Sequence, residues 1–198
     1  VMEDMNMIDR WLLCKLHKII KSSTESFDKY EYARTKADVE QFFWHTLCDN
    51  YIEIVKVRLY NPEDVGVNPT VSGRFTLYHA VLAVLKMMAP IMPHITEAVY
   101  GLYFNEKEKH KSIHQESWPL VIEKYIDEEA EKVGDLFVDM VSTVRRYKSD
   151  NDKSLSTPVT SLVIECNEGQ QLVLSAMLDD MKNVIRGEKI EFGTGNIA

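Results

Sequence analysis

Two clusters of basic and aromatic residues have the side-chain types and the spacing that RNA binding requires. The first lies on faces of one predicted helix that can look outward, and it consists of Trp44, Tyr51, Lys56 and Arg58. The second, residues 145–148 (RRYK), ends a later predicted helix. Aromatic rings stack on unpaired bases, and Arg or Lys side chains neutralise phosphates. The clusters therefore indicate a surface that binds looped or single-stranded RNA.

The same residues have a structural interpretation that does not involve RNA. Trp44 and Tyr51 are of types often found in a helical core, and a basic helix end suits the helix macrodipole. The chain also has a formal net charge of −8 at pH 7, whereas nucleic-acid binding normally relies on a broad basic surface. Any RNA contact must come from local basic patches, and a helical protein-interaction module without RNA binding is the alternative.

No catalytic motif accompanies the two clusters. The sequence has no glycine-rich phosphate loop and no Gly-x-Ser-x-Gly nucleophile turn. His110 and His114 are four residues apart, but they lie in a predicted loop and no further ligand completes a zinc site. Cys14, Cys48 and Cys166 fit neither a disulfide framework nor a zinc ribbon, and we expect them to be buried thiols. We therefore expect no catalytic residue, metal or cofactor in this chain.

The composition is that of an ordinary folded protein of a reducing compartment. Of the 198 residues, 45% are hydrophobic and 27% are charged. No apolar stretch reaches the roughly 18 residues that a membrane span needs, and the first residues are acidic where a signal peptide would be basic. These features favour a cytoplasmic protein without a membrane span. The chain begins in the middle of a pattern, as we expect of a piece cut from a longer protein.

Apolar residues recur at three- and four-residue steps through the first two-thirds of the chain, which predicts amphipathic helices. These helices cover residues 8–27, 39–59, 72–88 and 93–103. The two prolines, Gly66 and two asparagines between Asn61 and Ser72 predict a loop, with Ser72 capping the third helix. Pro90 ends that helix and Pro93 opens the next one. Four helices that each must bury one face predict an antiparallel bundle.

The last third of the chain changes its pattern. A fifth helix, from 127 to 151, is acidic in its first turns and basic in its last, which suits the helix macrodipole. After Pro158 a strand is predicted around residues 162–166, then a short helix through 177–184 and a second strand at 189–192. The predicted fold is therefore mainly α: a helical-bundle domain at residues 1–120, then a long helix and a small α/β unit at residues 121–198.

Four segments of the chain form a series that is known from one enzyme family. They are residues 42–53 (FFWHTLCDNYIE), 88–97 (MAPIMPHITE), 112–119 (SIHQESWP) and 144–158, which contains VRRYKS, SL and TP. In order and spacing this series resembles the anticodon-binding region of class I aminoacyl-tRNA synthetases. The run CDNYIE is most similar to the valyl-tRNA synthetases, and the last segment to their archaeal type. The alternative within the class is a fragment of an isoleucyl- or leucyl-tRNA synthetase.

The resemblance implies a division of labour within a longer enzyme. The parent protein would attach valine to tRNA(Val) with ATP and magnesium in a Rossmann-type catalytic core, beside an editing domain. Neither the His-Ile-Gly-His nor the Lys-Met-Ser-Lys-Ser signature of that core occurs in this chain. The resemblance therefore implies a tRNA-binding fragment that is inactive alone, whose partners are tRNA and the missing domains of its own chain. It also implies a cytoplasmic monomer.

The resemblance also directs the choice of contact residues. Asn50 and Arg58 lie near the loop-side end of the second helix, so one or the other is expected to contact the anticodon loop. Arg145, Arg146 and Lys148 are expected to lie on tRNA phosphates.

Overall fold

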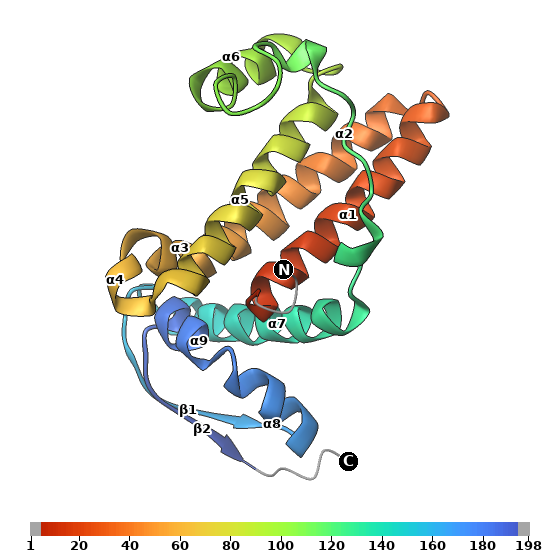
Figure 1. The fold of residues 1–198 in the computed structure, drawn as a ribbon. Coiled ribbons are helices and arrows are strands. Elements are labelled where there is room, and N and C mark those ends of the chain that lie inside the picture. The colour runs from red at the N-terminus through yellow and green to blue at the C-terminus, as the bar shows by residue number, and fades with distance from the viewer. Residues whose placement is uncertain (1–4, 194–198) are drawn as a thin grey trace.

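The computed structural model describes residues 5–193, with the side chains of residues 64 and 65 left out, and the fold is mainly α-helical (Figure 1). In chain order the helices of the first part are α1 (Met7–Asp28), α2 (Tyr32–Gln41), a π-helical segment (Phe42–Ile52), α3 (Glu53–Tyr60), α4 (Pro62–Val65), α5 (Val67–Met88) and α6 (Pro93–Tyr103). The second part contains α7 (Glu128–Asp150), β1 (Val159–Glu165), α8 (Glu168–Ser175), α9 (Leu178–Ile185) and β2 (Gly187–Gly193). The predicted mainly α fold, a bundle followed by a small α/β unit, is confirmed.

Three antiparallel segments form the bundle: α1, the continuous helix α2–α3, and α5 (Figure 1). The short helix α6 lies across one end of the bundle, and α7 crosses the other end beneath α1. The core contains Leu12, Leu16, Tyr51, Ile54 and Met87, each at most 1% exposed. Leu12, Leu16 and Ile54 belong to the apolar patterns that predicted their helices, whereas Met87 of α5 lies outside the apolar face predicted for that helix.

The second predicted helix is longer and less regular than its pattern indicates. It runs from Tyr32 to Tyr60, and its middle, Phe42–Ile52, has the wider turn of a π-helix. Wider turns change which residues share a face, so a face assigned with the ordinary helical period is displaced beyond this segment. Tyr51, predicted on an outward-looking face, is fully buried.

The loop predicted from Asn61 to Ser72 was wrong, because most of it is helical. Pro62 occupies the first turn of α4, where no N–H is needed. Gly66 has a φ of +90°, so the break between α4 and α5 takes a single residue. Pro69 lies in the first turn of α5, which it can open. Ser72 is therefore inside α5, and its hydroxyl donates to Asp9 instead of capping a helix.

The α/β unit is a pair of parallel strands joined through two helices. β1 and β2 pair in the register Leu162↔Ile190, and α8 and α9 form the crossover that parallel strands require. The unit packs on the bundle mainly through α9, whose Met181 and Ile185 are 2% exposed and join the same hydrophobic cluster as α1, α3 and α7. That cluster contains residues on both sides of residue 120, and the domain boundary placed there stays a prediction.

Local polar contacts determine where α7 crosses α1. Asp127, the predicted start of the fifth helix, caps it by accepting a hydrogen bond from the Ala130 N–H at 3.0 Å. The acidic first half of α7 also faces basic residues of α1: Lys15 Nζ lies 2.8 Å from Asp135 Oδ2 and 3.2 Å from Glu131 Oε1. The predicted acid-to-base gradient of this helix therefore serves both its own dipole and the contact with α1.

His17 has a structural role in the core, and two of the three cysteines are buried thiols as expected. His17 is buried, its Nδ1 accepts the Ile122 N–H at 3.1 Å, and its ring stacks on Tyr125. Burial, with the nearby His79, lowers the pKa of His17 to about 4. Cys14 and Cys166 are buried thiols and Cys48 is partly buried.

Gly134 marks the closest approach of α7 to α1. A Cβ at this position would lie 2.2 Å from Cγ and Cδ1 of Trp11, whose ring is buried and held by a 2.8 Å bond from Nε1 to Asp135 Oδ1. We expect Gly134→Ala to lower the free energy of unfolding by about 1–3 kcal/mol, because the helices must move apart. This loss would exceed the roughly 1 kcal/mol that alanine normally gains over glycine inside a helix.

Urea denaturation measures this effect, and Gly101→Ala is its matched control. Gly101 lies in α6, and a Cβ there would meet nothing within 4 Å. That substitution should therefore raise the free energy of unfolding by up to about 1 kcal/mol. Stabilisation of the same size by Gly134→Ala would show that α7 and Trp11 are not in such close contact.

Candidate RNA interface

A groove runs between the bundle and the α/β unit, with walls from the π-helical segment and α3, the end of α7, and the turn from α9 to β2. Its cavity volume is about 1040 Å³. The basic residues that line it come from all three walls: Lys56, Arg145, Lys148, Lys182 and Arg186. The acidic residues in its lining are Asp49 and Glu53. We call this the basic groove.

Asn50 and Arg145, predicted separately as RNA contacts, lie side by side at the edge of this groove. Arg145 Nη1 donates to the backbone carbonyl of Asp49 at 2.9 Å and to Asn50 Oδ1 at 3.3 Å. Asn50 Nδ2 in turn donates to the His45 carbonyl at 2.7 Å. Both side chains are partly exposed. This chain of bonds ties the end of α7 to the π-helical segment and places a guanidinium at the edge of the groove.

Lys148 reaches the groove but cannot bind a phosphate there, contrary to the prediction. It is 4% exposed, and its Nζ donates to the carbonyls of Ile185 at 2.8 Å and Leu155 at 3.0 Å. Burial, with the charge of Arg186, lowers the pKa of Lys148. Since Ile185 is the last residue of α9, the lysine satisfies a free carbonyl at the negative end of that helix. Its role is to hold the α/β unit against α7.

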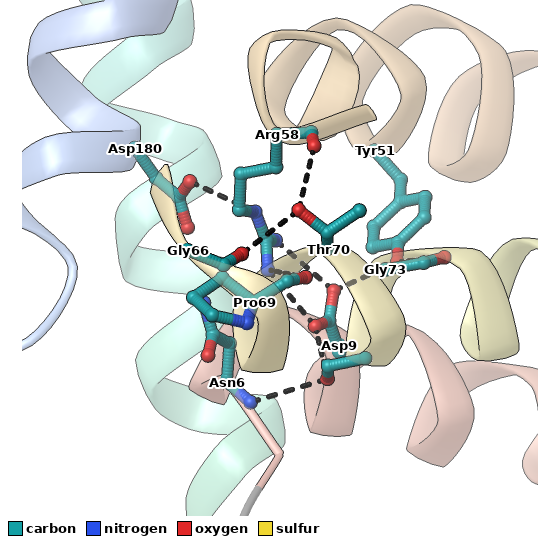
Figure 2. Close-up of polar contacts among 10 residues, drawn as sticks. Asn6, Asp9, Tyr51, Arg58, Gly66, Pro69, Thr70, Gly73 and Asp180 are labelled. Carbon is teal, nitrogen blue, oxygen red and sulfur yellow. Dashed lines mark hydrogen bonds and ion pairs between the residues drawn. The ribbon is translucent and has the colours of Figure 1, made fainter. Parts of the chain in front are cut away.

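Arg58 was also predicted to contact RNA, and the structure contradicts this prediction. Its side chain is 1% exposed and lies between Asp9 and Asp180 (Figure 2). The guanidinium makes two bonds with Asp9, Nη1 to Oδ2 at 3.0 Å and Nη2 to Oδ1 at 3.1 Å. On its other side Nε lies 3.1 Å from Asp180 Oδ1 of α9, as an ion pair without the alignment of a hydrogen bond. Arg58 therefore joins α1, α3 and α9 internally.

Further groups complete this buried network around Asp9. The Tyr51 hydroxyl donates to Asp9 Oδ1 at 2.7 Å, and Ser72 donates to Oδ2 (Figure 2). Burial of the carboxyl, reinforced by Asp9 and Asp179 and opposed by Arg58, raises the pKa of Asp180 to about 6. The network thus fixes the position of α9, and with it one wall of the basic groove.

Comparison with known proteins identifies a family for this chain. The family model for the anticodon-binding domain of tRNA ligases matches residues 9–164, from α1 to β1. The chain belongs to this family. It is 35% identical over 193 residues to a valine–tRNA ligase of Thermococcus kodakarensis, 33% over 192 residues to that of Pyrococcus furiosus and 37% over 188 residues to that of Rickettsia conorii. These alignments cover 98%, 97% and 94% of the chain but 21–22% of each relative, so the chain spans about a fifth of their length.

Two basic residues that sequence reasoning missed lie in the α/β unit, beyond the residues that the family model matches. Lys182 and Arg186 are exposed and line the basic groove opposite Lys56. Arg186 ends α9 in a left-handed conformation, with a φ of +57°. Both residues lie in a segment without aromatic neighbours, so no RNA-binding pattern marked them, and only the packing of α9 on α3 brings them to the groove.

Arg146 is exposed beside Tyr147, which is 69% exposed, and neither belongs to the lining of the groove. The phosphate contact assigned to Arg146 therefore stays a prediction. Trp44 is 58% exposed, as predicted for an outward face.

Among residues 5–193 no group of three or more His, Cys, Asp or Glu side chains could hold a metal ion. No helix formed by these residues is long and apolar enough to cross a membrane.

Proposed function

We propose that this chain is the part of a valine–tRNA ligase that holds the anticodon arm of tRNA(Val). The observation that carries the proposal is the family match over residues 9–164, together with similarity to valine–tRNA ligases along nearly the whole chain. The parent enzyme would join valine to tRNA(Val) with ATP and magnesium, in catalytic and editing domains outside this chain. We further propose that the enzyme is a cytoplasmic monomer, and that this chain alone has no ligase activity.

The basic groove is the proposed contact surface. Lys56, Lys182 and Arg186 are exposed on its opposite walls, so a backbone lying in it would meet cations from both sides. Arg145 is held at its edge by Asn50. Local placement of cations resolves the conflict with the acidic chain, because phosphates respond to charges within about a Debye length, roughly 8–10 Å in physiological salt. Affinity should therefore be moderate and strongly dependent on salt.

The test is fluorescence anisotropy with a labelled anticodon stem-loop of the valine type, titrated at several salt concentrations. We expect the double variant Lys182→Gln and Arg186→Asn to bind more weakly and to reduce the log–log salt slope by about 1.4, at roughly 0.7 per lost phosphate contact. Asparagine is chosen at Arg186 because it tolerates a positive φ. Stem-loops of the isoleucine type and scrambled loops test the identity, and the valine loop should bind more tightly than either.

The matched control removes the same charge from the opposite end of the bundle. Lys29 and Arg34 flank the turn between α1 and α2, and both are exposed. Lys29→Gln with Arg34→Gln should leave affinity and slope close to those of the unchanged chain. Equal losses in the two double variants would mean that RNA responds only to net charge, and that the basic groove is not the site. Arg145→Ala with Arg146→Ala tests the remaining phosphate assignment, which unchanged binding would refute.

A further inference from the structure

A second groove lies beside the first along α3, between α3, α5 and α6. Its cavity volume is about 1160 Å³. Five of its lining residues are aromatic: Tyr60, Phe75, Tyr78, Tyr103 and Phe104. The helix α3 thus forms a ridge between this groove, which we call the aromatic groove, and the basic groove.

Three of the five aromatic side chains in this groove are exposed. Tyr60 is 82% exposed, Tyr103 53% and Phe75 38%, whereas Phe104 is buried. Tyr103 is positioned by neighbouring rings, with its centroid 5.1 Å from that of Phe104 and 6.2 Å from that of Tyr78. Exposed rings that line one groove are typical of a binding surface. Tyrosine rings in such a cluster offer flat faces with little side-chain entropy to lose on binding.

The charges around these rings select the kind of ligand. The charged residues that line the aromatic groove, Lys56 and Arg74, are both basic. Lys107 also places its Nζ 3.8 Å from the centroid of the Tyr103 ring. Carboxylates also lie near these groups, since Lys56 pairs with Glu53 and the Tyr78 hydroxyl donates to Glu108 Oε1 at 2.6 Å. Because the charged lining residues themselves are basic, the surface is still complementary to a ligand that carries flat bases and phosphates. An apolar protein segment would offer these cations no negatively charged partner.

The two grooves are continuous at one residue. Lys56 lines both of them, since it lies exposed on the ridge that α3 forms. A strand whose phosphates lie in the basic groove therefore reaches the aromatic groove by crossing α3 at Lys56. Tyr60 lies one helical turn farther along α3, at its last residue.

We propose that the aromatic groove is a stacking site for unpaired bases of the anticodon loop, with Tyr60 and Tyr103 as the stacking residues and Arg74 on the adjoining phosphate. This inference rests on the proposed function and assigns a second site to it. Stacking on tyrosine uses the face of a base and not its hydrogen-bonding edge. The site would therefore distinguish unpaired loop bases from paired bases, but it would distinguish one base type from another only weakly. The affinity for RNA would then depend on unpaired loop bases at the aromatic groove and on phosphate contacts at the basic groove.

The experiment places 2-aminopurine at each loop position of the valine-type anticodon stem-loop in turn. Binding to the unchanged chain should quench or shift the emission of at least one loop position, because stacking on a ring changes it, while a probe in the stem should be unaffected. Tyr60→Ala with Tyr103→Ala should abolish that change and weaken binding roughly five-fold or more. Tyr60→Phe with Tyr103→Phe keeps both rings and should retain the change.

Tyr30→Asn is the matched control, since Tyr30 is 79% exposed in the turn between α1 and α2, outside both grooves, and asparagine tolerates its positive φ. Circular dichroism melts show that each variant is folded. The stacking site would be overturned if the double alanine variant kept its affinity and emission while Lys182→Gln with Arg186→Asn lost affinity. That outcome would leave the proposed function standing. Equally tight binding of a fully paired hairpin would also overturn it. If no anticodon stem-loop binds the unchanged chain, the proposed function fails and this inference fails with it.

Discussion

Replacing Arg58 by alanine should lower the free energy of unfolding by about 3–5 kcal/mol at pH 7, the typical result of breaking a buried ion pair from one side. The guanidinium lies between two carboxylates, Asp9 at 0% and Asp180 at 7% exposure. Its removal leaves both without their cation in a site of low dielectric, where an isolated charge is costly. It also withdraws the donor to the Pro69 carbonyl.

Urea denaturation followed by circular dichroism measures this loss. Arg74→Ala is the control, because Arg74 is an exposed arginine on α5 and its replacement should change stability by no more than about 0.5 kcal/mol. Arg58→Lys should give an intermediate loss, since an ammonium keeps the charge but cannot make the paired bonds to both oxygens of Asp9. A loss in Arg58→Ala as small as that in Arg74→Ala would show that the side chain is not buried in this network.

The second large effect is a pH dependence that comes from Asp180. Its pKa in the folded chain is about 6, chiefly because of burial, against an ordinary value of 3.8. The folded state therefore holds this proton more tightly than the unfolded state. The resulting stabilisation is fully present below about pH 4 and is lost as the pH rises through about 6. A difference of about two pKa units corresponds to a loss of roughly 2–3 kcal/mol.

The variant Asp180→Asn isolates this contribution, because every other titrating group remains in place. The free energy of unfolding is measured for both proteins between pH 4 and pH 7.5. Relative to the variant, the unchanged chain should lose stability across this interval and then level off. A difference that grows in the opposite direction would mean that attraction to Arg58 outweighs burial and that the pKa of Asp180 lies at or below its usual value.

The elements of the fold were largely predictable from local patterns. Each of these patterns reflects an interaction within about ten residues of the chain. They are the apolar periods of α1 and α7, the helix ends at Asn61 and Pro90, and the alternation in β1. The predicted loop before Ser72 failed because turn-forming residues also suit helix ends. Pro62 and Pro69 both lie in first turns, and Gly66 alone makes the break.

The site was less predictable, because its residues are sorted by contacts between distant segments. Arg58 and Lys148 look like surface cations in the sequence, and their partners, Asp180 and the Ile185 carbonyl, lie 122 and 37 residues away. The pairing of Asn50 with Arg145 likewise depends on where α7 ends against the π-helical segment. Residue type identified cations in or near the basic groove, but only packing decides which of them face outward.

The π-helical segment has a consequence for how this helix tolerates insertions and deletions. Because its wide turns hold more residues than α-turns, Phe42–Ile52 sets the rotational phase of everything that follows in the same helix. Loss of one residue there would turn α3 about its axis relative to α2. This rotation would move Arg58 away from its carboxylates and would also move Lys56 and Tyr60 out of the two grooves. A change in the length of this segment would therefore disturb the buried network and the two grooves together.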